Sequence, residues 1–164
     1  MKIILTLVLT LTTLTSFADQ LVGKVIKVTD GDTVNVLTGD NQTHKIRLSG
    51  IDAPEKSQAF GNKSKQALAD EVDGKTVTVE FNKRDKYQRI VGKVIFNGND
   101  VNLGQIKRGL AWHYKKYENE QDVDDRSIYA NAEYLAQRDK VGLWFDANPI
   151  PPWDFRKQKR EAAN

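Results

Sequence analysis

The sequence predicts an α+β protein, mainly β, in which about five strands form a small barrel or curled sheet with about three packed helices. Short β-branched segments are separated by Gly, Asp and Asn turn signals at intervals of roughly 8–12 residues. Apolar residues recur at helical spacing in later segments. The chain has 164 residues, of which 39% are hydrophobic and 29% charged. This length and composition fit a single globular domain.

Strand patterns occur in five segments. They are residues 22–28, 33–37, 45–48, 75–81 and 90–96. The first segment runs into the tight turn Asp30-Gly31-Asp32, and the second is rich in β-branched residues. In the third, a period of two places Ile46 and Leu48 on one face and Arg47 on the other. Such alternation is typical of strands that bury only one face.

Helix patterns occur in three segments, residues 60–72, 101–108 and 124–140. Gly109 and Gly142 follow the second and third segments, where a glycine commonly ends a helix. The third segment is expected to bury a stripe of apolar residues on one face. This stripe consists of Ile128, Ala132, Leu135 and Ala136.

Residues 1–18 have the layout of a secretory signal peptide. Lys2 precedes an apolar run, and Ser16-Phe17-Ala18 provides small residues at the −3 and −1 positions of a cleavage site. We therefore expect cleavage after Ala18 and a secreted or periplasmic protein. A buried N-terminal strand or helix is the alternative. The run is too short to cross a bilayer, so no membrane anchor is expected.

The mature chain is expected to fold over residues 19–146 and to end in a tail over residues 147–164. Prolines and a basic run at residues 156–160 characterise this tail. Such a run either attracts nucleic acid electrostatically or has no binding role.

The composition excludes several kinds of chemistry. Cysteine is absent, which removes disulfides, thiolate zinc sites and catalytic thiols. His44 and His113 are the only histidines, so a three-histidine metal site cannot form. Hydrolysis by this chain would depend on carboxylates, arginines and a hard cation.

Three polar motifs adjoin the predicted strands. They are Asp30-Gly31-Asp32-Thr33, the segment from Arg47 to Glu55, and Arg84-Asp85-Lys86-Tyr87-Gln88-Arg89. The first suits oxygen ligation of a cation, but an Asp-Gly turn is also common without one. The second places two carboxylates three residues apart after an arginine. Each motif alone is ambiguous, because a polar turn or a solvated loop also explains it.

Together, the motifs resemble the staphylococcal nuclease (thermonuclease) family over about residues 22–144. The shared patterns are Asp-Gly-Asp-Thr, Arg-Leu-x-x-Ile-Asp-Ala-Pro-Glu and Asp-Lys-Tyr-x-Arg, in this order. The resemblance implies a five-stranded OB-fold barrel with three helices. It also implies calcium-dependent hydrolysis of phosphodiester bonds in DNA and RNA.

The resemblance assigns roles to particular residues. The metal ligands it implies are Asp32, Asp52 and the backbone carbonyl of Ala53, with Asp30 as a further acid near the Ca²⁺. The catalytic residues it implies are Glu55, which activates or orients water, and the phosphate-binding Arg47 and Arg89. Lys86 and Tyr87 match nucleotide contacts, and Tyr114 is a candidate for stacking on a base.

These roles agree with the chemistry of phosphodiester hydrolysis. A metal neutralises charge on the anionic ester, guanidiniums bind its oxygens, and a carboxylate activates water. We expect a monomer that prefers single-stranded nucleic acid. One alternative is a non-catalytic OB-fold nucleic-acid-binding protein, although such a binder would not need Asp32, Asp52 and Glu55. Another is a calcium-stabilised secreted interaction protein in which the arginines are incidental.

Overall fold

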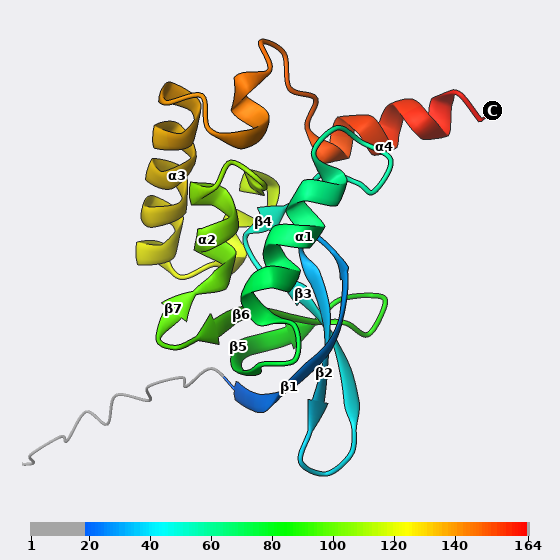
Figure 1. Ribbon diagram of the computed structural model, residues 1–164, viewed down its shortest axis with the longest axis vertical. Coiled ribbons are helices and arrows are strands. Elements are labelled where there is room, and N and C mark those ends of the chain that lie inside the picture. The colour runs from blue at the N-terminus through cyan, green and yellow to red at the C-terminus, as the bar shows by residue number, and fades with distance from the viewer. Residues whose placement is uncertain (1–18, 164) are drawn as a thin grey trace, which may run out of the picture.

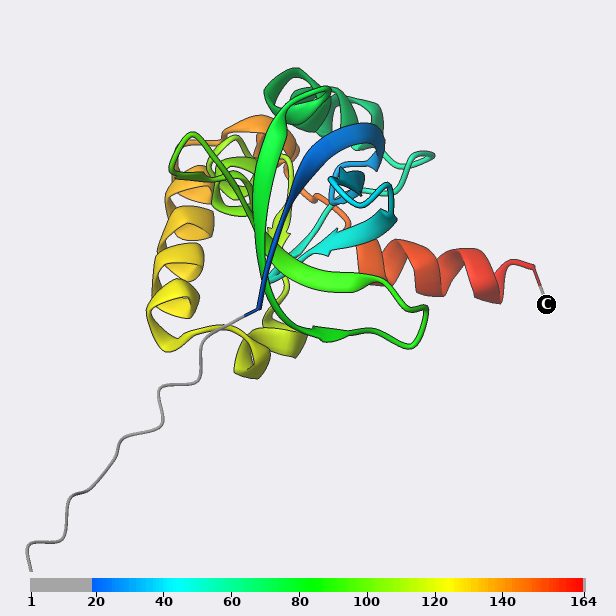
Figure 2. The same cartoon turned by 90° about the horizontal axis from the view of Figure 1, so that it is seen from below.

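The computed structural model describes residues 19–163. Its centre is a closed β-barrel, confirming the predicted OB-fold architecture (Figures 1 and 2). The barrel strands are β1 (Asp19–Asp30), β2 (Thr33–Thr38), β3 (Thr43–Leu48), β5 (Thr76–Arg84) and β6 (Ile90–Phe96). They are ordered β3-β2-β1-β5-β6 with antiparallel neighbours, and a parallel pairing of β3 with β6 closes the barrel. The predicted signal peptide, residues 1–18, lies outside the described residues. Within residues 19–163, no helix has the length and apolar character needed to cross a membrane.

The barrel interior follows the alternation predicted for its strands. Ile46 and Leu48 of β3 are buried, as are Val77 and Val79 of β5. Arg47, between the two buried residues of β3, faces the opposite side and lines a pocket. The strand period that fills the core therefore also directs this arginine into the pocket.

Three helices pack against the barrel at the predicted places. They are α1 (Gly61–Val72), α2 (Val101–Lys107) and α3 (Val123–Arg138). Each of the three is close to the range expected from its apolar spacing. Figure 1 shows α2 and α3 side by side on one flank and α1 across the barrel.

The predicted apolar stripe of α3 is partly wrong. Ile128 and Leu135 are exposed, while Tyr129 and Glu133 are buried beside Ala132 and Ala136, as the list of buried α3 residues shows. The two polar residues tolerate burial because they have partners. The Tyr129 hydroxyl donates to Asp100 at 2.7 Å, and the Glu133 carboxylate accepts from the backbone N–H of His113 at 2.9 Å.

Short elements complete the fold around the barrel. They are β4 (Ile51–Asp52), β7 (Asn99–Asp100), β8 (Trp112–His113) and the 3₁₀ helices η1 (Lys115–Glu120) and η2 (Gly142–Phe145). β4 pairs with β8 and so brings the segment after β3 against the chain that follows α2. This pairing fixes the position of Asp52.

The C-terminal segment contains a helix that the sequence analysis did not predict. α4 (Pro152–Glu161) begins with proline in its first turn, where the missing N–H is not needed. Figures 1 and 2 show α4 extending from the barrel as a separate arm. Its first turn is anchored, because the ring of Trp153 lies parallel to that of Tyr114 with centroids 5.4 Å apart. The segment expected to be a tail therefore contributes Arg156 of α4 to the pocket that Arg47 lines.

Candidate active site

The turn between β1 and β2 presents Asp32 to the pocket. Gly31 is required there, because a Cβ at this position would lie 1.9 Å from the Ser64 hydroxyl oxygen on α1. The Gln105 side chain on α2 donates to the Gly31 carbonyl at 2.7 Å. The backbone N–H of Asp32 donates to Asp30 Oδ1 at 3.1 Å. Two helices and a local hydrogen bond thus hold Asp32 in one position.

Asp52 is held by the β4–β8 pairing and by a buried asparagine. Asn102 on α2 donates to the carbonyls of Ser49 at 3.0 Å and Gly92 at 3.2 Å, which fixes the segment that leads into β4. The next residue, Ala53, donates its N–H to Asp32 Oδ2 at 2.7 Å. Asp32 and Asp52, although far apart in the chain, therefore belong to one rigid cluster.

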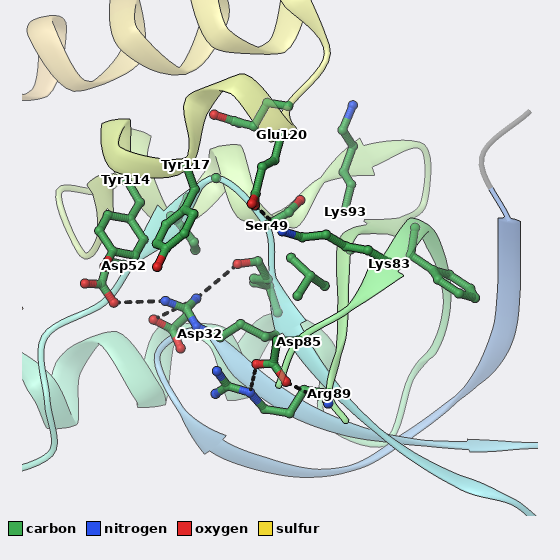
Figure 3. Close-up of a pocket in the computed structure, with 18 of the residues that line it drawn as sticks. Asp32, Ser49, Asp52, Lys83, Asp85, Arg89, Lys93, Tyr114, Tyr117 and Glu120 are labelled. Carbon is green, nitrogen blue, oxygen red and sulfur yellow. Dashed lines mark hydrogen bonds and ion pairs between the residues drawn. The ribbon is translucent and has the colours of Figure 1, made fainter. Parts of the chain in front are cut away.

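Arg47 joins the two carboxylates. Its Nη1 lies 3.0 Å from Asp32 Oδ2 and its Nη2 lies 2.9 Å from Asp52 Oδ1. Figure 3 shows the side chains of Asp32 and Asp52 pointing toward the same region of the pocket. The two acids are 6% and 1% exposed, respectively, so their charges are poorly solvated and need a cationic partner.

Burial raises the pKa of two carboxyl groups in this cluster, Asp52 and Asp30. Burial raises the pKa of Asp52 above its ordinary value, although Arg156 and Arg47 oppose this effect. Burial and the adjacent Asp32 carboxylate raise the pKa of Asp30 to about 6. A cation bound among these carboxylates would favour their ionised forms.

The cluster fits the donor set of a hard divalent cation. Asp32 and Asp52 supply buried anionic oxygens close enough together to share one guanidinium, and the Asp30 carboxylate adjoins them. Within residues 19–163, no three acidic or histidine side chains converge as a ready-made cage. Arg47 lies between the acids instead, so a cation would have to compete with this arginine.

Glu55 lies in the same pocket, at the mouth rather than the floor. Its side chain is 40% exposed, and Arg156 Nη1 donates to its Oε1 at 2.8 Å. Arg156 also contacts Asp52, with Nη2 at 2.7 Å from Oδ2. Arg156 was not predicted as a site residue, because its segment has the prolines and the basic run of a tail. The available signals were Pro151-Pro152 as a helix start and the three-residue spacing of Trp153 and Arg156.

Arg89 and its loop form another side of the pocket. Arg89 Nε donates to Asp85 Oδ2 at 2.7 Å, and its guanidinium lies 5.6 Å from the centre of the Tyr87 ring. The Lys86 ammonium lies 5.1 Å from the same ring. Tyr87 is 69% exposed, leaving the ring open to solvent. Figure 3 shows the Asp85–Arg89 pair, which lines the same pocket as Asp32.

Tyr114 lies on the opposite side, next to Asp52 (Figure 3). One face of its ring is stacked on Trp153, and Tyr117 meets it edge-on with centroids 4.9 Å apart. A base could therefore reach only the parts of Tyr114 that these rings leave open. All the predicted site residues line one pocket of about 1150 Å³. They are Asp30, Asp32, Arg47, Asp52, Ala53, Glu55, Lys86, Tyr87, Arg89 and Tyr114.

An OB-fold barrel with clustered acids and arginines in one groove has the features of a nuclease. Residues 45–146 match the family described as Staphylococcal nuclease homologue, and the chain belongs to this family. The chain is therefore a hydrolase that acts on phosphodiester bonds. Enzymes of this family are generally metal-dependent.

Curated relatives support this assignment. The chain is 44% identical to an "Uncharacterized endonuclease" of Haemophilus influenzae over 137 residues, covering 84% of this chain and 74% of the relative. It is 40% identical to an Escherichia coli protein of the same description over 138 residues, covering 84% and 86%. A "Micrococcal nuclease" of Shigella flexneri is 36% identical over 151 residues, covering 87% and 84%.

Proposed function

We propose that this protein is an exported, calcium-dependent nuclease that hydrolyses DNA and RNA by in-line attack of water. The observation that carries the proposal is the joining of two buried carboxylates, Asp32 and Asp52, by Arg47. Glu55 lies at the mouth of the same pocket. This arrangement brings together a cation-binding group, a phosphate-binding group and a water-handling group.

The chemistry of each side chain in the pocket determines its proposed role. Asp32, Asp52 and the carbonyl of Ala53 would hold Ca²⁺, which would supply charge neutralisation and a template for ester and water. Arg47 and Arg89 bind the phosphate oxygens, because a guanidinium matches them with two parallel donors and stays charged at alkaline pH. Glu55 orients the water and accepts its proton.

The surroundings favour a single strand over a duplex. The exposed side chain of Tyr87 and the exposed part of Tyr114 offer stacking surfaces for bases, and Lys86 adds a positive charge for the backbone. Bases in a duplex are already stacked and paired, so they would have to separate before reaching these rings. One chain supplies every residue of this site, so a monomer suffices.

Chelation of divalent cations should abolish cleavage of denatured DNA and of RNA, and added calcium should restore it. Magnesium should restore it less well, because Mg²⁺ requires a tighter octahedral shell and gives up its waters reluctantly. Cleavage is measured on labelled single strands in chelator, calcium and magnesium. Full activity in chelator would show that hydrolysis does not require a divalent cation. Binding without cleavage in calcium would favour the non-catalytic alternative.

Export should remove residues 1–18 and leave Asp19 as the first residue. The basis is the Ser16-Phe17-Ala18 cleavage pattern after an apolar run. Mass spectrometry of protein recovered from the periplasm or the medium identifies the N-terminus. Exported protein that retains Met1 would contradict the assignment.

A further inference from the structure

We propose that Arg156 of α4 is a third phosphate-binding arginine of this active site, held by Asp52 and Glu55 until the substrate arrives. The inference rests on the proposed function and adds to it a substrate contact from outside the barrel. It also gives α4 a role as one wall of the nucleic-acid groove.

The guanidinium of Arg156 lies beside two carboxylates of the proposed active site. Arg156 lies 2.7–3.3 Å from three oxygens that belong to Asp52 and Glu55. If Glu55 handles the attacking water, the phosphorus must lie about 3–3.5 Å from that water. The phosphate oxygens then fall within hydrogen-bonding reach of the Arg156 guanidinium, which already contacts Glu55. The side chain of Arg156 is 35% exposed, and it lines the same pocket as Glu55.

Contacts of α4 and the residues before it hold this side chain in place. Arg156 follows Trp153 by three residues and so shares its face of the helix. The Trp153 ring stacks on Tyr114 at an interplanar angle of 5° and meets Trp112 edge-on with centroids 5.6 Å apart. The Gln58 amide also donates to the carbonyl of Ile150, just before the helix. These contacts direct Arg156 into the pocket, whereas Lys159 on the same helix is exposed.

The charge balance of the pocket also favours a role for Arg156. The connected cluster contains more carboxylates than guanidiniums. Its members are Asp30, Asp32, Asp52 and Glu55 against Arg47 and Arg156. Fully ionised, the cluster has a net charge of 2 − 4 = −2. A divalent cation would make it neutral. Without Arg156 it would remain negative and repel the anionic ester.

The test compares Arg156→Gln with Lys159→Gln, which removes the same charge from an exposed position of the same helix. Affinity for a fluorescent phosphorothioate single strand, which resists cleavage, is measured by anisotropy in calcium over a range of salt concentrations. Arg156→Gln should weaken binding about tenfold and reduce the log–log salt slope by about 0.7, the value for one lost phosphate contact. Arg156→Lys should restore the slope but only part of the affinity, because it keeps the charge and loses the fork.

Lys159→Gln should change affinity by less than about twofold, since this residue lies outside the pocket. Tryptophan fluorescence checks that Trp153 stays docked in each variant. Unchanged affinity and slope in Arg156→Gln would overturn the proposal. Tighter binding would also overturn it and show that Arg156 blocks the groove. Wild-type cleavage of the ordinary phosphodiester strand in calcium is measured in parallel, so a failure of the nuclease assignment is seen separately.

Discussion

Replacing Glu55 by glutamine should lower kcat by roughly 10²–10⁴-fold while leaving substrate affinity nearly unchanged. The amide keeps the shape of the side chain but cannot accept the proton of the attacking water. The packing cost should be small, because Glu55 lies at the mouth of the pocket with a 40% exposed side chain. Arg156 keeps its contacts with Asp52 in this variant.

The measurement is single-turnover cleavage at saturating calcium, with strand binding measured separately. Glu161→Gln is the matched control, since it makes the same exchange at an exposed position of α4. Wild-type turnover in a folded Glu55→Gln protein would show that Glu55 is an ordinary carboxylate of the pocket rim. Asp30 would then be the next base to test.

Replacing Arg47 by lysine should lower kcat by about 10²–10³-fold. Losses of this size follow the removal of one hydrogen-bond donor that stabilises the transition state in other enzymes. Lysine keeps the positive charge between Asp32 and Asp52 but cannot contact both acids and a phosphate with a planar fork. Replacement by a neutral residue would be less informative. It would leave two buried carboxylates without this partner and would destabilise the fold.

Thermal unfolding and circular dichroism establish that Arg47→Lys is folded before rates are compared. Arg138→Lys serves as a control, because Arg138 is exposed and pairs only with its neighbour Asp139 among its described ion pairs. Near-normal turnover by Arg47→Lys would show that the Arg47 guanidinium does not stabilise the transition state. Its role would then be limited to balancing the charge of the two acids.

The barrel could be predicted because its strands follow simple local rules. Alternation in residues 45–48 and 75–81 set which side chains are buried, and turn residues separated the strands. The site residues could also be predicted from their motifs, since each motif adjoins a strand end that the barrel brings to one pocket. The resemblance to a known family then supplied roles that no single motif could establish.

The parts that could not be predicted depend on contacts between distant segments. Tyr129 and Glu133 are buried because Asp100 and the His113 backbone satisfy them, and apolar spacing alone contains no such information. The role of α4 depends on the stacking of Trp153 on Tyr114, which lies 39 residues earlier in the chain. Without the contact between Trp153 and Tyr114, a basic run after prolines is typical of a tail.

The most direct test of the account is a calcium titration of the cleavage rate for the wild type and Asp32→Asn. The central claim is that Asp32 and Asp52 bind the cation on which hydrolysis depends. If so, Asp32→Asn removes one formal charge from the metal shell. Its half-maximal calcium concentration should rise at least about tenfold, with part of the activity returning at high calcium. An unchanged calcium requirement in the folded variant would contradict the claim.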